Sequence, residues 1–299
     1  MERRRLGRTG LSVSALGFGA SEIGQQRTAL KAVAEMLGSA LDAGLNLIDT
    51  AACYGNSEEL IGRSAGHRRQ DFYLLTKCGH AAGLAFNDWT PALIQASVER
   101  SLVRLRTDYL DVVQLHSCSE RLLRRGDLIV ALRRAREQGK LRYIGYSGDG
   151  RAALYAAQCG AFDTIQISLS IADQEAIELV LETARERDIG VIAKRPLANA
   201  AWLAGSWWSL GLYSWPYRTR LRKLNYEFLS GDARQAVAIA LGFTLSVPGV
   251  HSAIVGTTKS SRWQQNAALV AKGPLPPHEY ESIRARWRTI ATPGWVGLE

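Results

Sequence analysis

Residues 46–62 read NLIDTAACYGNSEELIG, and this stretch is the key to the rest of the chain. It starts inside a short apolar run, Leu45 to Ile48, that is typical of a buried strand and stops at Asp49. A turn carrying Tyr54 follows, and Ser57 then begins a helix, since serine is a good N-cap and the acids after it suit the positive first turn. A carboxylate thus lies at the carboxyl end of a strand and a tyrosine in the next loop, where α/β barrels and open sheets hold their reactive groups.

Two later apolar runs also end in reactive side chains. Phe72 to Thr76 is followed by Lys77, and Tyr109 to Leu115 is followed by His116. The carboxyl ends of parallel strands meet at one face, so these side chains are expected to face the turn that carries Tyr54. The alternative, a carboxylate and an aromatic ring that serve only the turn, leaves this repetition at successive strand ends unexplained.

These four residue types have a combined chemical logic. A buried ammonium such as that of Lys77 needs a partner, because isolated buried charge is costly, and Asp49 can be that partner. A nearby ammonium favours the phenolate, so Lys77 should lower the pKa of Tyr54, which is about 10 when unperturbed. His116 can hydrogen-bond a carbonyl oxygen. The set predicts a proton donor beside a polarised carbonyl, which suits carbonyl reduction with hydride supplied by a cofactor.

Here the sequence resembles a known family, the aldo-keto reductase superfamily. The run LIDTAACYGNSEELIG, Lys77 and His116 look like the signature of that superfamily, whose catalytic tetrad is Asp, Tyr, Lys and His. The resemblance extends from LGRTGLSVSALGFGA near the start to the segment Gly256–Asn266. It implies a (β/α)8 TIM barrel with an N-terminal β-hairpin cap, and a catalytic tetrad of Asp49, Tyr54, Lys77 and His116.

The remaining sequence alternates short apolar runs with amphipathic segments, the rhythm of a barrel of this kind. Thr9-Gly10 predicts the hairpin turn. The expected strands are Ala15–Phe18, Leu45–Ile48, Phe72–Thr76, Tyr109–Leu115, Arg142–Tyr146, Thr164–Ile167, Gly190–Ala193 and Ser252–Val255. The expected helices are Ala29–Ala43, Ser57–Ala65, Pro91–Leu105, Asp127–Gln138, Arg151–Gln158, Asp173–Arg187, Ser260–Ala271 and Pro277–Arg288.

No linker rich in Ser, Gly or Pro interrupts this rhythm, so residues 1–299 are expected to form a single domain. An open doubly wound sheet is the structural alternative. It would favour a Gly-x-Gly-x-x-Gly turn after the first strand, and the run Gly17–Glu22 lacks the third glycine.

The composition restricts the class of partner. The net charge of +9 fits nucleic acid, a membrane surface, an anionic cofactor or simply a basic surface. Basic runs such as Arg3–Arg5 and Arg218–Lys223 are short and match no nucleic-acid motif, so no nucleic-acid partner is expected. The start of the chain has no apolar signal region and no run is long enough to span a bilayer, which predicts a cytoplasmic protein with no membrane partner. Nothing in the composition specifies an oligomeric state.

The four cysteines form no C-x-x-C pair, so neither a zinc site nor any other metal site is expected. Cys53, Cys78 and Cys118 each lie beside a tetrad position and should approach one another at the barrel mouth. They are interpreted as small polarisable residues in a reducing cytosol, with sensitivity to oxidation as the alternative.

The resemblance also assigns the nicotinamide end of a cofactor to residues that follow several strands: Gly19, Ala20, Ser147, Gln166, Lys194, Arg195, Pro196 and Leu197. Two positions depart from the family pattern. Gly148 stands where an Asn usually helps to hold the nicotinamide amide, and Lys194 stands where an aromatic ring usually stacks. Lysine offers only its stem to a ring, whereas Arg195 could contact a phosphate.

The segment GTTKSSRWQQN, residues 256–266, matches the family's nucleotide loop and helix start. Backbone N–H groups at a helix N-terminus favour phosphate there. Lys259 and Arg262 add cations, which makes a 2′-phosphate plausible and NADPH preferred over NADH; a solvated helix start is the alternative. The cofactor residues expected here are Gly256, Thr257, Thr258, Lys259, Arg262, Gln265 and Asn266.

Aromatic residues are candidates for the substrate pocket. The segment Ala201–Tyr217 is dense in them and is either a lid or pocket wall, or a packing or oligomer surface. The expected wall residues are Phe86, Trp89 and Trp202.

The sequence therefore predicts an NADPH-dependent oxidoreductase that reduces aldehydes or ketones to alcohols, with the reverse oxidation chemically possible. Tyr54 is the general acid, supported by Lys77, Asp49 and His116. The alternative is an NADP(H)-binding, redox-sensing regulatory subunit with the same fold, against which the intact tetrad argues.

Overall fold

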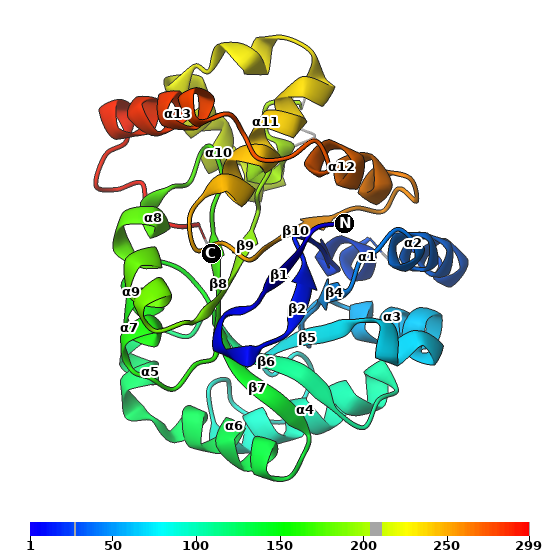
Figure 1. The fold of residues 1–299 in the computed structure, drawn as a ribbon. Helices are drawn as coiled ribbons and strands as arrows, with labels where there is room; N and C mark the ends of the chain where they lie inside the picture. The colour runs from blue at the N-terminus through cyan, green and yellow to red at the C-terminus, as the bar shows by residue number, and fades with distance from the viewer. Residues whose placement is uncertain (27, 204–210, 299) are drawn as a thin grey trace.

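Eight parallel strands close into a barrel, which confirms the predicted (β/α)8 fold (Figure 1). The computed structural model describes residues 1–26, 28–203 and 211–298. Around the barrel the strand order is β10-β3-β4-β5-β6-β7-β8-β9. The strands are β3 (Leu16–Gly19), β4 (Leu47–Asp49), β5 (Tyr73–Cys78), β6 (Leu110–His116), β7 (Leu141–Ser147), β8 (Thr164–Ser168), β9 (Gly190–Lys194) and β10 (Ser252–Gly256).

A two-stranded hairpin covers one end of the barrel, as expected. Strands β1 (Arg3–Arg5) and β2 (Ser12–Ser14) pair antiparallel, and Gly10 takes a left-handed φ of 70° in the connection. Tyr143, near the start of β7, donates from its hydroxyl to the Thr9 carbonyl at 2.7 Å. The hairpin therefore lies on the amino ends of the strands, and Figure 1 shows it crossing the barrel centre in dark blue.

Apolar side chains fill the barrel interior on the hairpin side. They come from the hairpin segment and from five strands: Leu6, Leu11, Val13, Leu47, Leu75, Val112, Ile192 and Ile254. Residues two apart on a strand share a face, so the next inward positions above Leu47 and Leu75 are Asp49 and Lys77. The hairpin and this apolar layer close the amino end, and the polar side chains lie at the carboxyl end.

Helices surround the barrel (Figure 1) and bury their apolar faces against it. The described helices are α1 (Ser21–Gln25), α2 (Leu30–Asp42), α3 (Ser57–Ala65), α4 (Pro91–Leu105), α5 (Glu120–Arg125), α6 (Asp127–Glu137), α7 (Gly150–Gln158), α8 (Glu175–Leu179), α9 (Leu181–Glu186), α10 (Gly211–Leu224), α11 (Ala233–Ser246), α12 (Arg262–Val270) and α13 (Pro277–Ile290). Short 3₁₀ turns complete the fold: η1 (Gly7–Thr9), η2 (Gly66–Asp71), η3 (Ala198–Ala200) and η5 (Glu227–Ser230).

The helices differ from the prediction in several places, and the short helices α1 and α5 were not predicted. The segment expected as one helix, Asp173–Arg187, is divided at Val180, whose φ of −120° is not helical, into α8 and α9. Helices α10 and α11, between β9 and β10, were not predicted. Helix α11 is apolar on much of its circumference, so it has little of the alternation with polar residues on which recognition of a surface helix depends.

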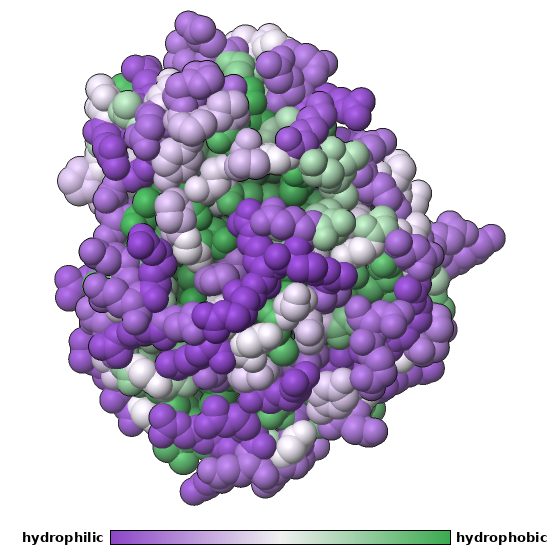
Figure 2. All heavy atoms as spheres, in the orientation of Figure 1, coloured by the Kyte–Doolittle hydropathy of each residue, from purple (hydrophilic) through white to green (hydrophobic). Residues whose placement is uncertain are grey.

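The face that carries the hairpin is largely hydrophilic, with apolar residues visible between the polar ones (Figure 2). Within residues 1–26, 28–203 and 211–298, no helix combines the length and apolar character needed to cross a membrane.

Candidate active site

Asp49 and Lys77 form a buried ion pair at the carboxyl end of the barrel. Lys77 Nζ lies 2.6 Å from Asp49 Oδ2 and also donates to the Thr50 carbonyl at 2.8 Å. The two charged side chains are 1% and 2% exposed. Burial disfavours the ammonium, but the charge and hydrogen bond of Asp49, together with the nearby Tyr54 and Cys53, keep the pKa of Lys77 above its ordinary value. The structure thus brings together the pair that the sequence indicated.

Two glutamine amides hold the other oxygen of Asp49. Gln114 and Gln166 each donate from Nε2 to Asp49 Oδ1, at 3.1 Å and 2.9 Å. Ser147 in turn donates to Gln166 Oε1 at 3.0 Å. Gln114 was not predicted, although it lies two residues before His116 on β6 and strand alternation places both on the inner face. The expected nicotinamide residues Ser147 and Gln166 are therefore linked by hydrogen bonds to the Asp49 carboxylate.

Tyr54 faces this pair from the turn after β4. The turn is fixed by two backbone bonds, Tyr54 N to Ala51 O at 3.0 Å and Ala52 N to Lys77 O at 3.1 Å. Lys77 Nζ lies 5.0 Å from the centroid of the Tyr54 ring. The His116 ring lies edge-on to the same phenol, with centroids 5.6 Å apart at 82°. All four residues of the expected tetrad therefore surround one place.

The electrostatics of Tyr54 differ from the prediction. Burial raises the pKa of the phenol, and the positive charge of Lys77 lowers it only in part, so the pKa of Tyr54 remains above its ordinary value. The predicted lowering by Lys77 is present, but the larger effect of burial was not predicted, because sequence alone does not give the degree of burial. The phenol is consequently protonated across the neutral range and available as a donor.

His116 is held neutral. Burial and the positive charges of Lys77, Lys194, His80 and Arg195 lower the pKa of its imidazole to about 2. A neutral imidazole has one N–H donor and one acceptor nitrogen. His116 can therefore donate a hydrogen bond to a carbonyl oxygen without carrying charge.

The lowered pKa of His116 leads to a prediction about the stability of the fold. Between about pH 6.5 and 2 the unfolded chain binds a proton on this histidine that the folded chain does not, so stability rises with pH in that window. Lowering the pH from about 7 to 5 should remove about 2 kcal/mol more stability from the wild type than from His116→Asn. Urea unfolding of both proteins at the two pH values measures the difference, in which other titrating groups cancel. Equal losses would contradict the assignment of a depressed pKa.

A second histidine, which the sequence analysis did not identify, lies at the mouth of the site. The His80 ring is 5.6 Å from the His116 ring and 4.9 Å from the Trp89 indole. Trp89 packs on Gly79, where a Cβ would lie 2.1 Å from the indole, so this contact requires glycine. His80 Nδ1 also lies 3.2 Å from Asp88 Oδ2. Trp89 thus contacts His80, which in turn contacts His116 of the expected tetrad.

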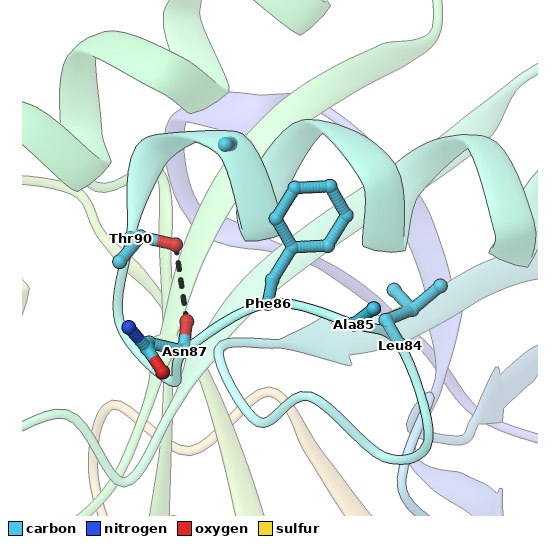
Figure 3. Close-up of a pocket in the computed structure, with 6 residues that line it drawn as sticks. Leu84, Ala85, Phe86, Asn87 and Thr90 are labelled. Carbon is cyan, nitrogen blue, oxygen red and sulfur yellow. Dashed lines mark hydrogen bonds between the residues drawn. The ribbon is translucent and has the colours of Figure 1, made fainter.

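Phe86 lies elsewhere on the same loop. Its side chain is 43% exposed and lines a shallow depression of about 520 Å³. Figure 3 shows the Phe86 ring beside α4, and the lining residues come from the loop and the start of that helix. Thr90 closes the loop by donating to the Asn87 carbonyl at 3.0 Å. The residues around this depression include none of the tetrad, so the structure does not bring Phe86 to the site.

The other expected wall residue, Trp202, is half-buried and packs against the core outside the barrel. Of the other tryptophans in its segment, Trp215 is 45% exposed, and Trp207 and Trp208 lie outside the described residues; Tyr217 is buried. The Tyr217 hydroxyl lies 3.4 Å from Asp173 Oδ2. Packing therefore accounts for Tyr217, while no contact joins Trp202 to the tetrad among the described residues.

The departure at Gly148 has a structural cause. A Cβ at this position would lie 2.3 Å from the hydroxyl oxygen of Tyr146. That hydroxyl donates to the Cys118 carbonyl at 2.9 Å, which fixes the ring in place. Tyr146 therefore occupies the space that a side chain after Ser147 would need.

Lys194, which stands where the family usually has an aromatic ring, forms an ion pair. Lys194 Nζ lies 2.9 Å from Asp149 Oδ2, and both side chains are nearly buried. Asp149 also accepts hydrogen bonds from the backbone N–H and the hydroxyl of Ser168, at 2.6 Å and 2.9 Å. The lysine stem is thus held at the carboxyl end of β9 by the loop that follows β7.

Arg195 contacts Ser168 and a segment far along the chain. Its Nη1 donates to Ser168 Oγ at 2.7 Å and to the Leu298 carbonyl. Gly297 approaches Asp149 so closely that a Cβ would lie 2.4 Å from the Asp149 Cβ. Residues 296–298 therefore lie beside the positions assigned to the cofactor.

The expected nucleotide loop follows β10, which pairs with β9 on one side and with β3 on the other. Gly256 pairs in register with Gly19, the residue before Ala20, and a Cβ on Gly256 would lie 3.1 Å from the Gly19 carbonyl oxygen, so the two backbones approach closely. Lys259 and Arg262 are exposed at the start of α12, whereas Asn266 is buried. The other expected residues of this region also lie in it: Thr257 and Thr258 on the loop, Gln265 on α12, Pro196 and Leu197 after β9.

The four cysteines are free thiols. Cys53 Sγ lies 3.4 Å from His116 Nδ1, and Cys78 and Cys118 are buried. Cys78 Sγ lies 3.7 Å from the Gln114 carbonyl. Cys53 therefore contacts the tetrad directly.

The donor set fits a nicotinamide dinucleotide. Bare backbone at Gly19 and Gly256, the polar groups of Ser147 and Gln166 near the tetrad, and exposed cations at a helix start are the features that such a ligand needs. With the tetrad they define a class of protein, a (β/α)8 barrel that holds aspartate, tyrosine, lysine and histidine together beside residues that fit a nucleotide.

Comparison with known proteins gives the family. The aldo/keto reductase family matches residues 15–288, and the chain belongs to it. It is 27% identical to the uncharacterized oxidoreductase YqkF of Bacillus subtilis over 95% of this chain and 96% of that protein. It is 28% identical to L-galactose dehydrogenase of Arabidopsis thaliana, covering 91% and 89% of the two chains.

Solved structures agree with this result. The aldo-keto reductase AKR11C1 from Bacillus halodurans, in its holo form, superposes with a TM-score of 0.83 at 27% identity, covering 96% of each chain. A putative aldo-keto reductase from Pseudomonas superposes with a TM-score of 0.73 at 27% identity, covering 90% and 94%. The protein is therefore an oxidoreductase of a family that uses nicotinamide cofactors for carbonyl reduction.

Proposed function

We propose that this protein reduces an aldehyde or ketone with NADPH, and that Tyr54 supplies the proton. The observation that carries the proposal is the position of the Lys77 ammonium, 2.6 Å from the Asp49 carboxylate and 5.0 Å from the Tyr54 ring centroid, with neutral His116 across from the phenol. A phenol, a buried cation and an uncharged imidazole around one place are what a carbonyl oxygen gaining charge would need.

Tyr54 is the proposed general acid because its pKa is raised and its proton is therefore present at neutral pH. As the proton leaves, negative charge develops on the phenol oxygen. The Lys77 ammonium is close enough to stabilise that charge, and Asp49 with its two glutamine partners keeps Lys77 in place. Transfer of the proton is thereby favoured in the reacting state, although the resting phenol is a weak acid.

His116 is proposed to orient the carbonyl. A charged imidazolium would compete with Tyr54 as a proton donor, whereas the neutral ring only donates a hydrogen bond. His80 and Trp89 then form the wall at the mouth, where they exclude water and contact the rest of the substrate.

Bound NADPH supplies the hydride. The residues proposed to hold it are Ser147 and Gln166 near the nicotinamide, Gly19 and Gly256 along the backbone, and the start of α12 at the phosphates. Lys194 is proposed to lie along the nicotinamide ring by its stem, held by Asp149.

The preference for NADPH over NADH is proposed to depend on Lys259 and Arg262. Both are exposed cations at the N-terminal end of α12, where a 2′-phosphate would gain charge-assisted hydrogen bonds. The double variant Lys259→Ala/Arg262→Ala should raise the KM for NADPH by at least about tenfold and leave that for NADH within about twofold, since such a bond contributes about 1.5–3 kcal/mol. Steady-state kinetics with each cofactor measures the ratio.

The matched control removes two exposed cations far from the nucleotide loop, at Arg133 and Arg134 on α6. That variant has the same net charge as the test variant and should keep the wild-type ratio. An unchanged NADPH preference in the test variant would show that these two cations do not select the cofactor.

A screen of NADPH oxidation against aldehydes, ketones and sugars tests the proposed activity. The Arabidopsis relative is named for L-galactose, so sugars and their oxidation with NADP⁺ belong in the panel. Turnover of one class with saturable kinetics is expected. Absence of turnover in either direction, together with a stable complex with another protein, would favour the regulatory-subunit alternative.

We propose further that residues 1–299 act as one domain built around the barrel. The four free thiols support a reducing compartment such as the cytoplasm as its location.

A further inference from the structure

The contact between Cys53 and His116 has a consequence for the proposed reaction. Cys53 Sγ lies 3.4 Å from His116 Nδ1, within hydrogen-bond distance for sulfur. Cys53 immediately precedes Tyr54 in the same backbone-bonded turn, so the thiol and the phenol are positioned together. Because Nδ1 is engaged by the thiol, Nε2 is the ring nitrogen left to serve a substrate.

The protonation states determine the direction of this hydrogen bond. Burial raises the pKa of the Cys53 thiol, so its S–H is present at neutral pH. Burial and nearby cations keep His116 neutral. A ring nitrogen is a good acceptor and sulfur a weak one, so the arrangement S–H to Nδ1 is the stronger of the two possible arrangements. In a neutral imidazole whose Nδ1 accepts, the proton resides on Nε2.

We propose that Cys53 is a positioning residue: its thiol donates to Nδ1 of His116 and holds that imidazole as the Nε2–H tautomer, ready to donate to a carbonyl oxygen. The inference rests on the proposed carbonyl reduction. Without the thiol, the proton could reside on either nitrogen, and the Nδ1–H form would present a lone pair to the carbonyl oxygen and repel it.

The test compares Cys53→Ala with Cys53→Ser. Alanine removes the donor, whereas serine keeps a hydroxyl that can donate to the same nitrogen. Cys159→Ala is the matched control, because Cys159 is also half-buried but lies at the end of α7. Nitrogen-15 NMR of the histidine side chains, with His116 assigned by its absence in His116→Asn, reads the tautomer directly and requires no turnover.

In the wild type the Nε2–H signature is expected. It should be retained in the serine and Cys159→Ala variants and be lost or averaged in Cys53→Ala. The kcat of Cys53→Ala should fall by about tenfold, the effect of one neutral hydrogen bond, with KM for NADPH unchanged and with recovery in Cys53→Ser.

The inference would be overturned if His116 of the wild type carried its proton on Nδ1, or if the tautomer of His116 were the same in Cys53→Ala as in the wild type. A tautomer change with undiminished kcat would also overturn it, because the contact would then be structural only. A wild type that turns over no carbonyl would overturn the proposed function instead, and the NMR result distinguishes that failure from failure of this inference.

Discussion

Tyr54→Phe is expected to reduce kcat for carbonyl reduction by about a thousandfold while leaving NADPH affinity within about twofold, since a positioned general acid contributes about 10²–10⁴. The substitution keeps the ring against Lys77 and His116 and removes only the oxygen that carries the proton. Steady-state kinetics and direct titration of NADPH binding measure the two quantities separately.

The control for this substitution is Tyr155→Phe on α7, where the ring lies against Arg124 away from the tetrad. It also removes one phenol oxygen, and its kcat should match the wild type. Undiminished reduction in Tyr54→Phe would end the assignment of this residue as the acid.

Asp49→Asn is expected to destabilise the fold by about 3–5 kcal/mol, because it leaves the Lys77 ammonium buried without a countercharge. An amide in place of the carboxylate also presents N–H where Lys77, Gln114 and Gln166 donate. Urea unfolding at about pH 7 measures the loss, and the same variant should have almost no reductase activity.

The exposed pair Glu120–Arg124 provides the comparison, since Glu120→Gln removes a carboxylate from an i,i+4 surface contact and should barely move the unfolding midpoint. If Asp49→Asn were equally harmless, Lys77 would have another countercharge or would be neutral in the folded chain. Either result would contradict the role of Asp49 as the partner of the Lys77 ammonium.

Strand periodicity made much of the barrel and its site predictable. Apolar runs predicted the ends of the strands to within about two residues. Since side chains two residues apart on a strand share a face, Asp49 and Lys77 point into the barrel as Leu47 and Leu75 do. The same rule could have identified Gln114 two positions before His116. His80 had no comparable signal, because its approach to His116 depends on how the loop folds over Gly79.

Other features depend on three-dimensional packing. From the sequence, Gly148 indicates only that one contact to the nicotinamide amide is missing. The structure shows that the Tyr146 hydroxyl occupies the space that a side chain at this position would need. The contact of Arg195 with Leu298 joins residues too far apart in the chain for any local pattern to indicate. The pKa of Tyr54 depends on the balance between burial, which raises it, and the charge of Lys77, which lowers it. Residue spacing indicates the effect of Lys77 but not that of burial.

Isotope transfer tests the central claim, that this tetrad directs hydride and proton to one carbonyl, most directly. A single turnover with NADPH that carries deuterium at both nicotinamide C4 positions should give an alcohol with one deuterium on the former carbonyl carbon, at a rate that falls about a thousandfold in Tyr54→Phe. An alcohol without deuterium, or equal rates in the two proteins, would contradict the account.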